Sequence, residues 1–240
     1  LQDLWTQLAH SERLAACDEA RLRKLVEAAT AKAVASQARQ LPEQFGDRFR
    51  SLEIERLTAL VLDWFNHERQ RTQAFEIDRL ESEQLLEIGP LRLRTRIDRI
   101  DRLADGSLVV IDYKTGKPID FSGWLEDRLT EPQLPAYCIS GGQPVGAAVF
   151  ANLARDRKQR GFTGIGEQAG FAPGVASVDD SDGFDEWHEL TGHWRDALSR
   201  LADEIHAGRC DPTPSVLACG YCEFGDLCRV EQQLAEALDD

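Results

Sequence analysis

Hydrophobic side chains recur at helical spacing through residues 1–70. They form three groups, and each group falls on one side of a helix because its members lie three or four residues apart. The groups are Leu1, Leu4, Trp5 and Leu8; Leu22, Leu25, Val26 and Ala29; and Leu57, Leu60, Val61, Trp64 and Phe65. Pro42 and Gly46 separate the second group from the third. The pattern predicts three packed helices, with His67 and Glu68 on a polar side in solvated or capping roles.

After residue 73 the pattern changes to the two-residue alternation of β-strands. Residues 74–80 and 84–88 alternate and predict two strands, which Gly89 and Pro90 separate from the next run. Residues 91–103 and 108–113 then flank a short Asp-Gly turn, which is a strong hairpin signal. The continuous apolar run 145–153 predicts a buried strand at the centre of a mixed sheet.

The remaining segments are predicted to be helices and loops. Residues 131–139 form a short helix on which Gln133 and Tyr137, four residues apart, share one face. Trp124 is expected to anchor the loop before this helix, and the glycine-rich residues 155–171 are expected to form another loop. Residues 184–207 carry an apolar stripe typical of an amphipathic helix. The whole pattern predicts an α/β domain with a mixed sheet flanked by helices.

The register of the 91–113 hairpin decides whether its carboxylates can act together. With a two-residue loop, Asp98 would lie opposite Tyr113 and point away from Asp112. With a three-residue loop ending at Gly106 in the left-handed conformation, Leu103 pairs with Ser107 and Asp98 lies opposite Asp112. Only this second register brings both carboxylates to the face that also carries Lys114.

Two carboxylates and an ammonium group on one face suit the hydrolysis of a phosphodiester. Hard oxygen ligands favour Mg²⁺ or Mn²⁺, and such a metal activates water and neutralises negative charge. A lysine beside the metal can orient water or stabilise developing negative charge. The alternative is a salt-bridged, solvated strand face, and residue spacing alone does not distinguish the two.

The segments RIDRID, DG, VVIDYKTGKP and QLPAY resemble the PD-(D/E)XK nuclease superfamily, specifically its RecB/AddB-like branch. The resemblance implies a restriction-endonuclease-like fold and DNA cleavage with Mg²⁺ or Mn²⁺. Asp98, Asp112 and the main-chain carbonyl of Tyr113 would hold the metal, and Lys114 would be the catalytic lysine. Gln133 and Tyr137 would line the DNA path. Arg96 stands where the branch often has glycine.

The resemblance also implies an element that the sequence lacks. Relatives carry Gly-x-x-x-His at the start of the first helix, whereas this sequence starts with LQDLW. We therefore expect an excised domain whose boundary falls just after that histidine. We further expect three regions: helices in 1–72, a nuclease core in 73–208, and a cysteine-containing tail in 209–240.

The tail places Cys219, Cys222 and Cys228 in a C-x2-C-x5-C spacing. Three thiolates hold an iron–sulfur cluster or zinc only with a fourth ligand. In the RecB/AddB-like branch this tail implies a cluster whose fourth cysteine lies upstream of the nuclease core. Cys210 and Cys17 are the candidates here, although Cys17 and Cys138 are expected to be structural. The alternative is three free or oxidised thiols around a compact turn.

Composition limits the remaining possibilities. The 240 residues, 42% of them hydrophobic, can bury a substantial core. The sequence contains neither an apolar run of about 20 residues nor a signal peptide, so a cytoplasmic location is expected. The resemblance places the chain in DNA repair or recombination beside a helicase-like partner. Two other classes stay open: a non-catalytic module for DNA contact or helicase docking, and a zinc-binding regulator.

The formal net charge of −14 generates the first prediction. Phosphate affinity comes mainly from Lys and Arg, so the isolated chain should bind DNA weakly, with an affinity that falls steeply as salt is added. Filter binding across a salt series measures this. Tight binding to double-stranded DNA at physiological salt would contradict it.

Overall fold

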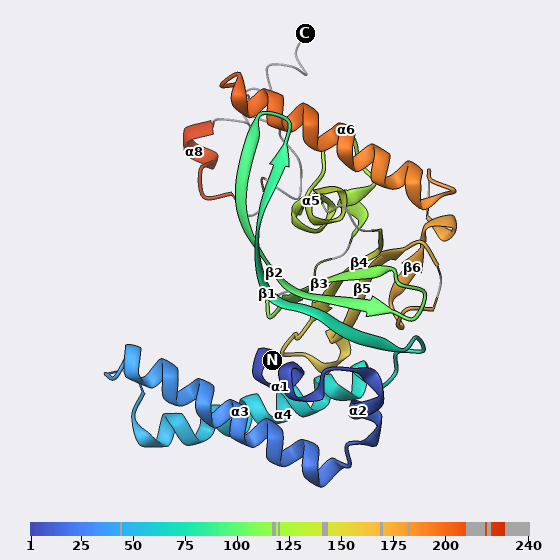
Figure 1. The fold of residues 1–240 in the computed structure, drawn as a ribbon. Coiled ribbons are helices and arrows are strands. Elements are labelled where there is room, and N and C mark those ends of the chain that lie inside the picture. Colours follow the sequence, from blue (N-terminus) through green and yellow to red (C-terminus); the bar gives the residue numbers. More distant parts are fainter. Residues whose placement is uncertain are drawn as a thin grey trace.

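The computed structural model has a six-stranded mixed sheet with helices on both faces (Figure 1). It describes residues 1–43, 45–116, 119, 121–140, 144–168, 170–181, 183–209, 219 and 222–228. The predicted α/β class with a central mixed sheet is confirmed. Within the described residues, no helix combines the length and apolar character needed to cross a membrane.

The N-terminal region contains four helices where three were predicted. They are α1 (Gln2–Leu8), α2 (Ser11–Ala16), α3 (Glu19–Gln40) and α4 (Asp47–Glu68). The additional helix is α2: α1 ends at Leu8, Ala9 has a φ of +61°, and His10 caps α2 by accepting a hydrogen bond from the Arg13 N–H. Asp18 caps α3 in the same way. Side chains that accept hydrogen bonds from backbone N–H groups thus set the starts of helices, which the spacing of apolar residues does not mark.

The strands follow one another in the sheet in the order of the sequence. They are β1 (Phe75–Ile88), β2 (Leu91–Leu103), β3 (Leu108–Lys114), β4 (Val145–Asn152), β5 (Gly161–Gly166) and β6 (Val175–Ser177). The β3–β4 and β5–β6 pairs are parallel, and the other neighbours are antiparallel. β4 lies inside the sheet, as its apolar run predicted.

Two strand predictions were wrong. The two runs within 74–88 form a single strand, β1, which tolerates a register shift near Ile77 and a φ of +49° at Glu81. The segment GFTGIG, predicted to be a loop, forms β5. A side chain at Gly164 would overlap the carbonyl oxygen of Ala148. This strand therefore uses a glycine for close approach, a signal that resembles a loop in sequence.

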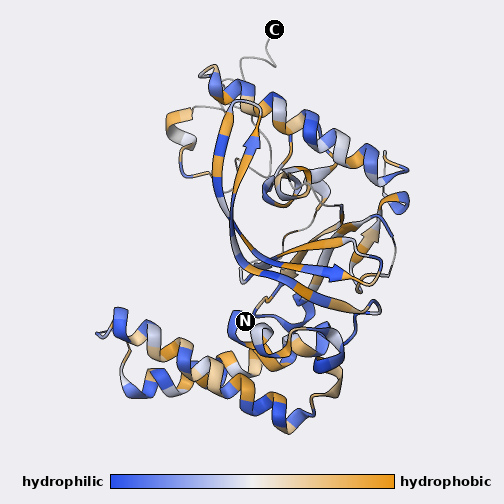
Figure 2. Cartoon of the chain, viewed as in Figure 1, coloured by the Kyte–Doolittle hydropathy of each residue, from blue (hydrophilic) through white to orange (hydrophobic). Residues whose placement is uncertain are grey.

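The strands β1 and β2 extend beyond the rest of the sheet as a long curved two-stranded arm (Figure 1). Hydrophilic and hydrophobic residues alternate along this arm (Figure 2). Leu86, Ile88 and Ile97 belong to the core beneath α5 (Gln133–Ser140) and α6 (Trp187–His206). Both helices were predicted close to these positions, and Trp124 is fully buried in the same core.

The two faces of β3 pack against different helices. Leu108 and Val110 face the core of α5 and α6, whereas Val109 and Ile111 pack with Trp64 of α4. Because side chains alternate along a strand, Asp112 and Lys114 belong to the α5 face, and Tyr113 belongs to the α4 face.

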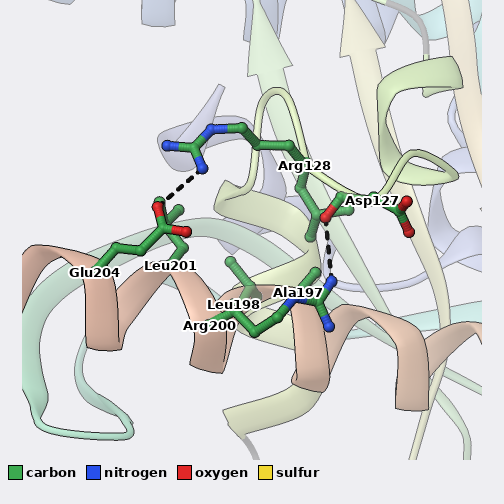
Figure 3. A pocket seen from close by; sticks show the side chains of 8 residues that line it. Asp127, Arg128, Ala197, Leu198, Arg200, Leu201 and Glu204 are labelled. Carbon is green, nitrogen blue, oxygen red and sulfur yellow. Dashed lines mark hydrogen bonds and ion pairs between the residues drawn. The ribbon is translucent and has the colours of Figure 1, made fainter. Parts of the chain in front are cut away.

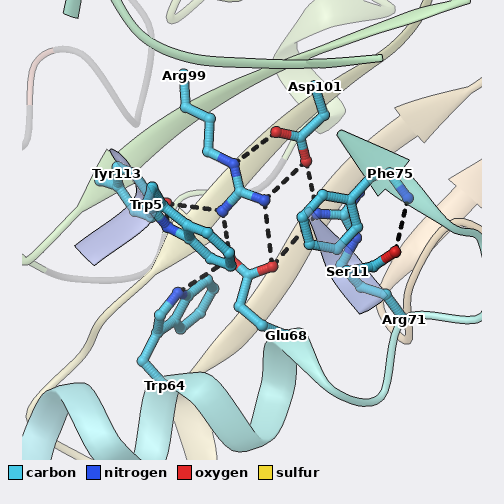
Figure 4. A network of polar contacts seen from close by, with 9 residues as sticks. All are labelled: Trp5, Ser11, Trp64, Glu68, Arg71, Phe75, Arg99, Asp101 and Tyr113. Atoms are coloured by element: carbon cyan, nitrogen blue, oxygen red, sulfur yellow. Dashed lines mark hydrogen bonds and ion pairs between the residues drawn. The ribbon is translucent and has the colours of Figure 1, made fainter. Parts of the chain in front are cut away.

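A buried network of charges joins α4 to the sheet on the second face (Figure 4). The Arg99 guanidinium donates to Asp101 Oδ1 at 2.6 Å from Nε and to Glu68 Oε1 at 2.6 Å from Nη1. Arg71 donates to Asp101 Oδ2 at 2.6 Å and to Glu68 Oε2 at 3.3 Å. All four side chains are essentially inaccessible to solvent. Glu68 is therefore an internal ion-pair partner, and the predicted solvated or capping role was wrong.

The network is electrically neutral, which makes its burial tolerable. Two guanidinium groups face two carboxylates, and Trp64 adds a hydrogen bond to Glu68 Oε1 at 3.1 Å. Burial alone would lower the pKa of Arg99, but Asp101 and Glu68 raise it well above its ordinary value. Arg71 also lies 3.6 Å above the ring of Phe75, a cation–π contact for a guanidinium whose Nε and Nη2 have no hydrogen-bond partner among the described residues.

This neutrality predicts a large effect from removing a single charge. Asp101→Asn keeps the size of the side chain but leaves two buried cations facing one carboxylate. We expect the free energy of unfolding to fall by about 3–5 kcal/mol, measured by urea denaturation. Glu87→Gln is the matched control, because its ion pair with Arg92 at 3.2 Å is exposed and should contribute about 1 kcal/mol or less. Equal losses in the two variants would contradict the prediction.

Candidate active site

The turn between β2 and β3 has the predicted three-residue form. The Leu103 N–H donates to the Ser107 carbonyl at 2.9 Å, and the Gly106 N–H donates to the Leu103 carbonyl at 3.0 Å. Gly106 has a φ of +88°, a conformation that favours glycine. The ladder continues to Arg99 opposite Ile111, so the next position along both strands places Asp98 across from Asp112. The predicted register is confirmed.

The pairing of β2 with β3 ends at the candidate site. One further hydrogen-bonded pair would join Tyr113 to Ile97, but the Tyr113 N–H donates instead to Asp98 Oδ2 at 2.9 Å. The carboxylate of Asp98 thus takes the place of a main-chain acceptor. This contact holds Asp98 beside the segment that carries Asp112 and Lys114.

Asp112 is buried, with a side chain that is 7% exposed. Gln133 Nε2 on α5 donates to Asp112 Oδ1 at 3.1 Å and to the Tyr137 hydroxyl at 3.0 Å. The Tyr137 hydroxyl donates to the main-chain carbonyl of Arg96 at 3.1 Å. The structure therefore links Gln133 and Tyr137 to both carboxylate-bearing strands, a link that their shared helix face did not reveal.

Lys114 Nζ lies 2.9 Å from Asp112 Oδ2. The two groups form an ion pair, and no group other than Lys114 approaches Oδ2 as a donor among the described residues. One oxygen of a buried carboxylate thus remains available for another ligand.

The surroundings of Asp112 disfavour its negative charge. Burial raises the pKa of this carboxyl above its ordinary value of 3.8, and Asp98 and Glu131 raise it further, while Lys114 acts in the opposite direction. Glu131 was not identified from the sequence. It has a φ of +50°, its carbonyl accepts a hydrogen bond from buried Trp124 at 3.1 Å, and it lies two positions before the start of α5. The feature of the sequence that marks Glu131 is its position directly before Pro132.

The residues present fit a hard divalent cation. Among the described residues, Lys114 is the only cation beside the buried Asp112 Oδ2, and Asp98 supplies a second carboxylate across the strand pair. In the part of the chain that the structure describes, no three Asp, Glu, His or Cys side chains gather closely enough to hold a metal. A metal here would therefore need main-chain, water or substrate oxygens in addition to Asp98 and Asp112.

The tail residues do not form such a group in the described part of the chain. Cys219 and Cys222 are exposed thiols and Cys228 is half-buried, while Cys210 lies outside the described residues. Cys17 and Cys138 are buried in the cores, as predicted. Within the described residues these thiols do not gather into a cluster site, so the iron–sulfur cluster stays a prediction from resemblance.

A separate pocket of about 360 Å³ lies between residues 127–129 and α6 (Figure 3). Its two arginines are engaged within it: Arg128 pairs with Glu204 at 2.9 Å, and Arg200 donates to the Asp127 carbonyl at 3.3 Å. These contacts fasten the loop to α6. The carboxylate site is the better candidate for chemistry, because its charged groups are incompletely satisfied.

Comparison with known proteins places this geometry in context. The family model described as the PD-(D/E)XK nuclease superfamily matches residues 1–229. No curated protein matches the chain. A solved structure, described as the crystal structure of SSO0001, is similar over 83% of this chain and 80% of that chain, at 15% identity and a TM-score of 0.37.

The raised pKa of Asp112 predicts a stabilising substitution. The folded state holds a proton on this carboxyl to higher pH than the unfolded state does, so stability falls as pH rises through the raised pKa. Asp112→Asn removes that charge and should raise the melting temperature at neutral pH, with a gain that shrinks in mild acid. Thermal unfolding across pH measures this.

Asp105→Asn is the control with the opposite sign. Hydrogen bonds from the Ser107 side chain and N–H lower the pKa of Asp105, so its ionised form favours the folded state. This substitution should lower the melting temperature at neutral pH. A lower melting temperature for Asp112→Asn at neutral pH would refute the account of Asp112.

Proposed function

Since the chain belongs to the PD-(D/E)XK nuclease superfamily, we propose that it is a nuclease domain that hydrolyses DNA phosphodiesters with Mg²⁺ or Mn²⁺. The observation that carries the proposal is the buried Asp112, whose Oδ2 has an ion pair with Lys114 but no other donor among the described residues. Lys114 compensates this charge only in part, because burial, Asp98 and Glu131 still raise the pKa of Asp112, so an added cation would stabilise the ionised carboxylate.

Asp98, Asp112 and the main-chain carbonyl of Tyr113 are the proposed metal-binding groups. When bound, the metal would lower the pKa of a water molecule and neutralise charge on the phosphate. The protein would contribute positioning. The Tyr113 N–H restrains Asp98, and Gln133 restrains Asp112.

Lys114 is the proposed catalytic lysine. Its side chain is 22% exposed and its ammonium lies beside Asp112, so the lysine can reach solvent as well as the carboxylate. From there it would orient the attacking water and stabilise negative charge that develops on the phosphate oxygens.

Gln133 and Tyr137 would contribute mainly by positioning. The Gln133 amide already spans Asp112 and Tyr137, and Tyr137 is buried. Direct contact between either residue and DNA stays a prediction. A setting in DNA repair or recombination, beside a helicase-like partner and within the RecB/AddB-like branch, is likewise part of the proposal.

The second candidate function is a non-catalytic module that docks a partner or contacts DNA. The net charge of −14 favours it, since acidic proteins repel phosphate. The retained trio of Asp98, Asp112 and Lys114 favours catalysis. Cleavage assays distinguish the two.

The test is cleavage of end-labelled single-stranded and double-stranded DNA with Mg²⁺, with Mn²⁺ and with a chelator. The unmodified chain should cleave only with metal. Lys114→Ala should lower the rate by at least about 100-fold, the scale for losing one group that stabilises the transition state. Lys158→Ala, at an exposed position outside the site, should cleave at the unmodified rate. Metal-dependent cleavage that survives Lys114→Ala would overturn the role of the lysine. A folded chain that cleaves neither DNA form would favour the non-catalytic module.

A further inference from the structure

Tyr113 is held from both faces of the sheet by two consecutive residues of β2. Asp98 accepts a hydrogen bond from the Tyr113 N–H at 2.9 Å. Arg99 Nη1 donates to the Tyr113 hydroxyl at 2.9 Å, on the opposite face. Within the described residues, Tyr113 is the only residue of β3 with hydrogen bonds to the side chains of both Asp98 and Arg99.

These two contacts occur where ordinary strand pairing ends. The β2–β3 ladder stops at Arg99 and Ile111. Beyond that point β3 keeps its ladder with β4, in which Tyr113 pairs with Ala151. On the β2 side, the main-chain ladder is replaced by the side chains of Asp98 and Arg99. The position of the metal-binding segment relative to β2 therefore depends on side-chain contacts.

The side chain of Arg99, which makes one of these two contacts with Tyr113, is itself held in place by several hydrogen bonds. Its guanidinium donates from Nε and Nη2 to Asp101 and from Nη1 and Nη2 to Glu68. The five N–H groups of an arginine lie in a fixed plane, so these partners determine where the bond to Tyr113 points. Figure 4 shows the hydroxyl of Tyr113 meeting Arg99 at the edge of the network.

A second buried donor meets the same hydroxyl. Trp5 Nε1 on α1 donates to it at 2.9 Å, and Trp5 is fully buried against Phe65 and Phe75. The hydroxyl oxygen thus accepts two hydrogen bonds from groups fixed by packing. Burial also raises the pKa of Tyr113 far above its ordinary value, which keeps the phenol neutral.

We propose that Tyr113 is a positioning residue whose buried hydroxyl, held by Arg99 and Trp5, sets the affinity of the Asp98–Asp112 site for a divalent metal. The inference rests on the proposed function and deepens it. Tyr113 connects the charged network to the metal site in two ways. Its N–H donates to Asp98 and its preceding residue is Asp112, while its hydroxyl accepts a hydrogen bond from Arg99 of the network. Arg99, Glu68 and Asp101 do not contact the metal site themselves and act on it through Tyr113.

A purely structural role for the hydroxyl predicts something different. Loss of two buried hydrogen bonds would then lower stability, as at any internal site, without changing metal affinity. The pair Thr30 and Thr58 supplies the comparison: their buried hydroxyls share a hydrogen bond of 2.9 Å between α3 and α4, within the helical region.

The experiment compares Tyr113→Phe with Thr58→Val. Each substitution removes a buried hydroxyl and keeps the approximate shape of the side chain. Binding of Mn²⁺ is titrated by electron paramagnetic resonance of the free ion, without DNA, and urea denaturation gives stability. Tyr113→Phe should weaken Mn²⁺ binding about 10-fold or more, the range seen when partners behind a metal ligand are lost. Thr58→Val should lose stability and keep the unmodified affinity.

Two further measurements separate positioning from simple destabilisation. Saturating Mn²⁺ should restore most of the cleavage rate of Tyr113→Phe. Hydrogen exchange of the 108–114 peptide should accelerate in Tyr113→Phe and stay unchanged in Thr58→Val. Trp5→Phe removes the other donor and keeps Tyr113 intact, so it should weaken Mn²⁺ binding in the same direction by a smaller factor. It also tests the inference if Tyr113→Phe does not fold.

The outcomes distinguish this inference from the proposed function. If the unmodified chain binds Mn²⁺ and cleaves DNA while Tyr113→Phe and Trp5→Phe bind Mn²⁺ with unchanged affinity, the positioning role is overturned and the nuclease proposal stands. If the unmodified chain binds no Mn²⁺ and cleaves nothing, both are overturned. Weakened Mn²⁺ binding in Thr58→Val equal to that in Tyr113→Phe would also overturn the positioning role.

Discussion

The buried ion pairs among Arg99, Arg71, Glu68 and Asp101 are the constraint on which the arrangement of helices and sheet depends. Charges in a protein interior are tolerated only when they are paired and hydrogen-bonded. Here the partners come from α4, the segment after it, and β2. If only apolar side chains joined α4 to the sheet, the helix could shift along the sheet with a modest loss of stability. A paired guanidinium cannot, because displacement would leave charged groups without partners.

Because side chains alternate along β3, this strand connects the ion-pair network on one face of the sheet to the candidate site on the other. Ile111 and Tyr113 lie on the side of α4 and the charged network, while Val110 and Asp112 lie on the side of α5. A short buried strand can therefore present a reactive carboxylate on one face while its neighbour is fixed on the other. The site needs this separation, since a network that satisfied Asp112 fully would leave no oxygen free for a metal.

The sequence was sufficient for those parts of the molecule that local rules decide. The Asp105–Gly106 pair predicted a hairpin but fitted both a two-residue and a three-residue loop; the three-residue register followed only from requiring Asp98 opposite Asp112, and the structure has it. Apolar runs located β4, α5 and α6 closely. The misses have non-local causes. Gly164 in β5 is selected by the approach of β4, and the single strand β1 passes through a left-handed residue, Glu81, that local preference opposes.

The charged network was the largest omission, and its cause is general. Glu68 and Arg99 carry the sequence signature of solvated positions, and only tertiary structure decides that each faces an opposite charge. The candidate site was easier to predict because its residues lie on a hairpin, where register alone brings Asp98 and Asp112 together.

The two buried carboxylate environments differ in a way that separates structure from function. Asp101 accepts hydrogen bonds from two guanidinium groups, and every charge around it is balanced. Asp112 has one amide donor and one ammonium beside it, with two further carboxylates raising its pKa. Burial is common to both, so burial alone does not identify a site. The difference lies in charge balance: Asp101 lies in a network of two guanidinium groups and two carboxylates, whereas Asp112 and Asp98 share a single ammonium, that of Lys114.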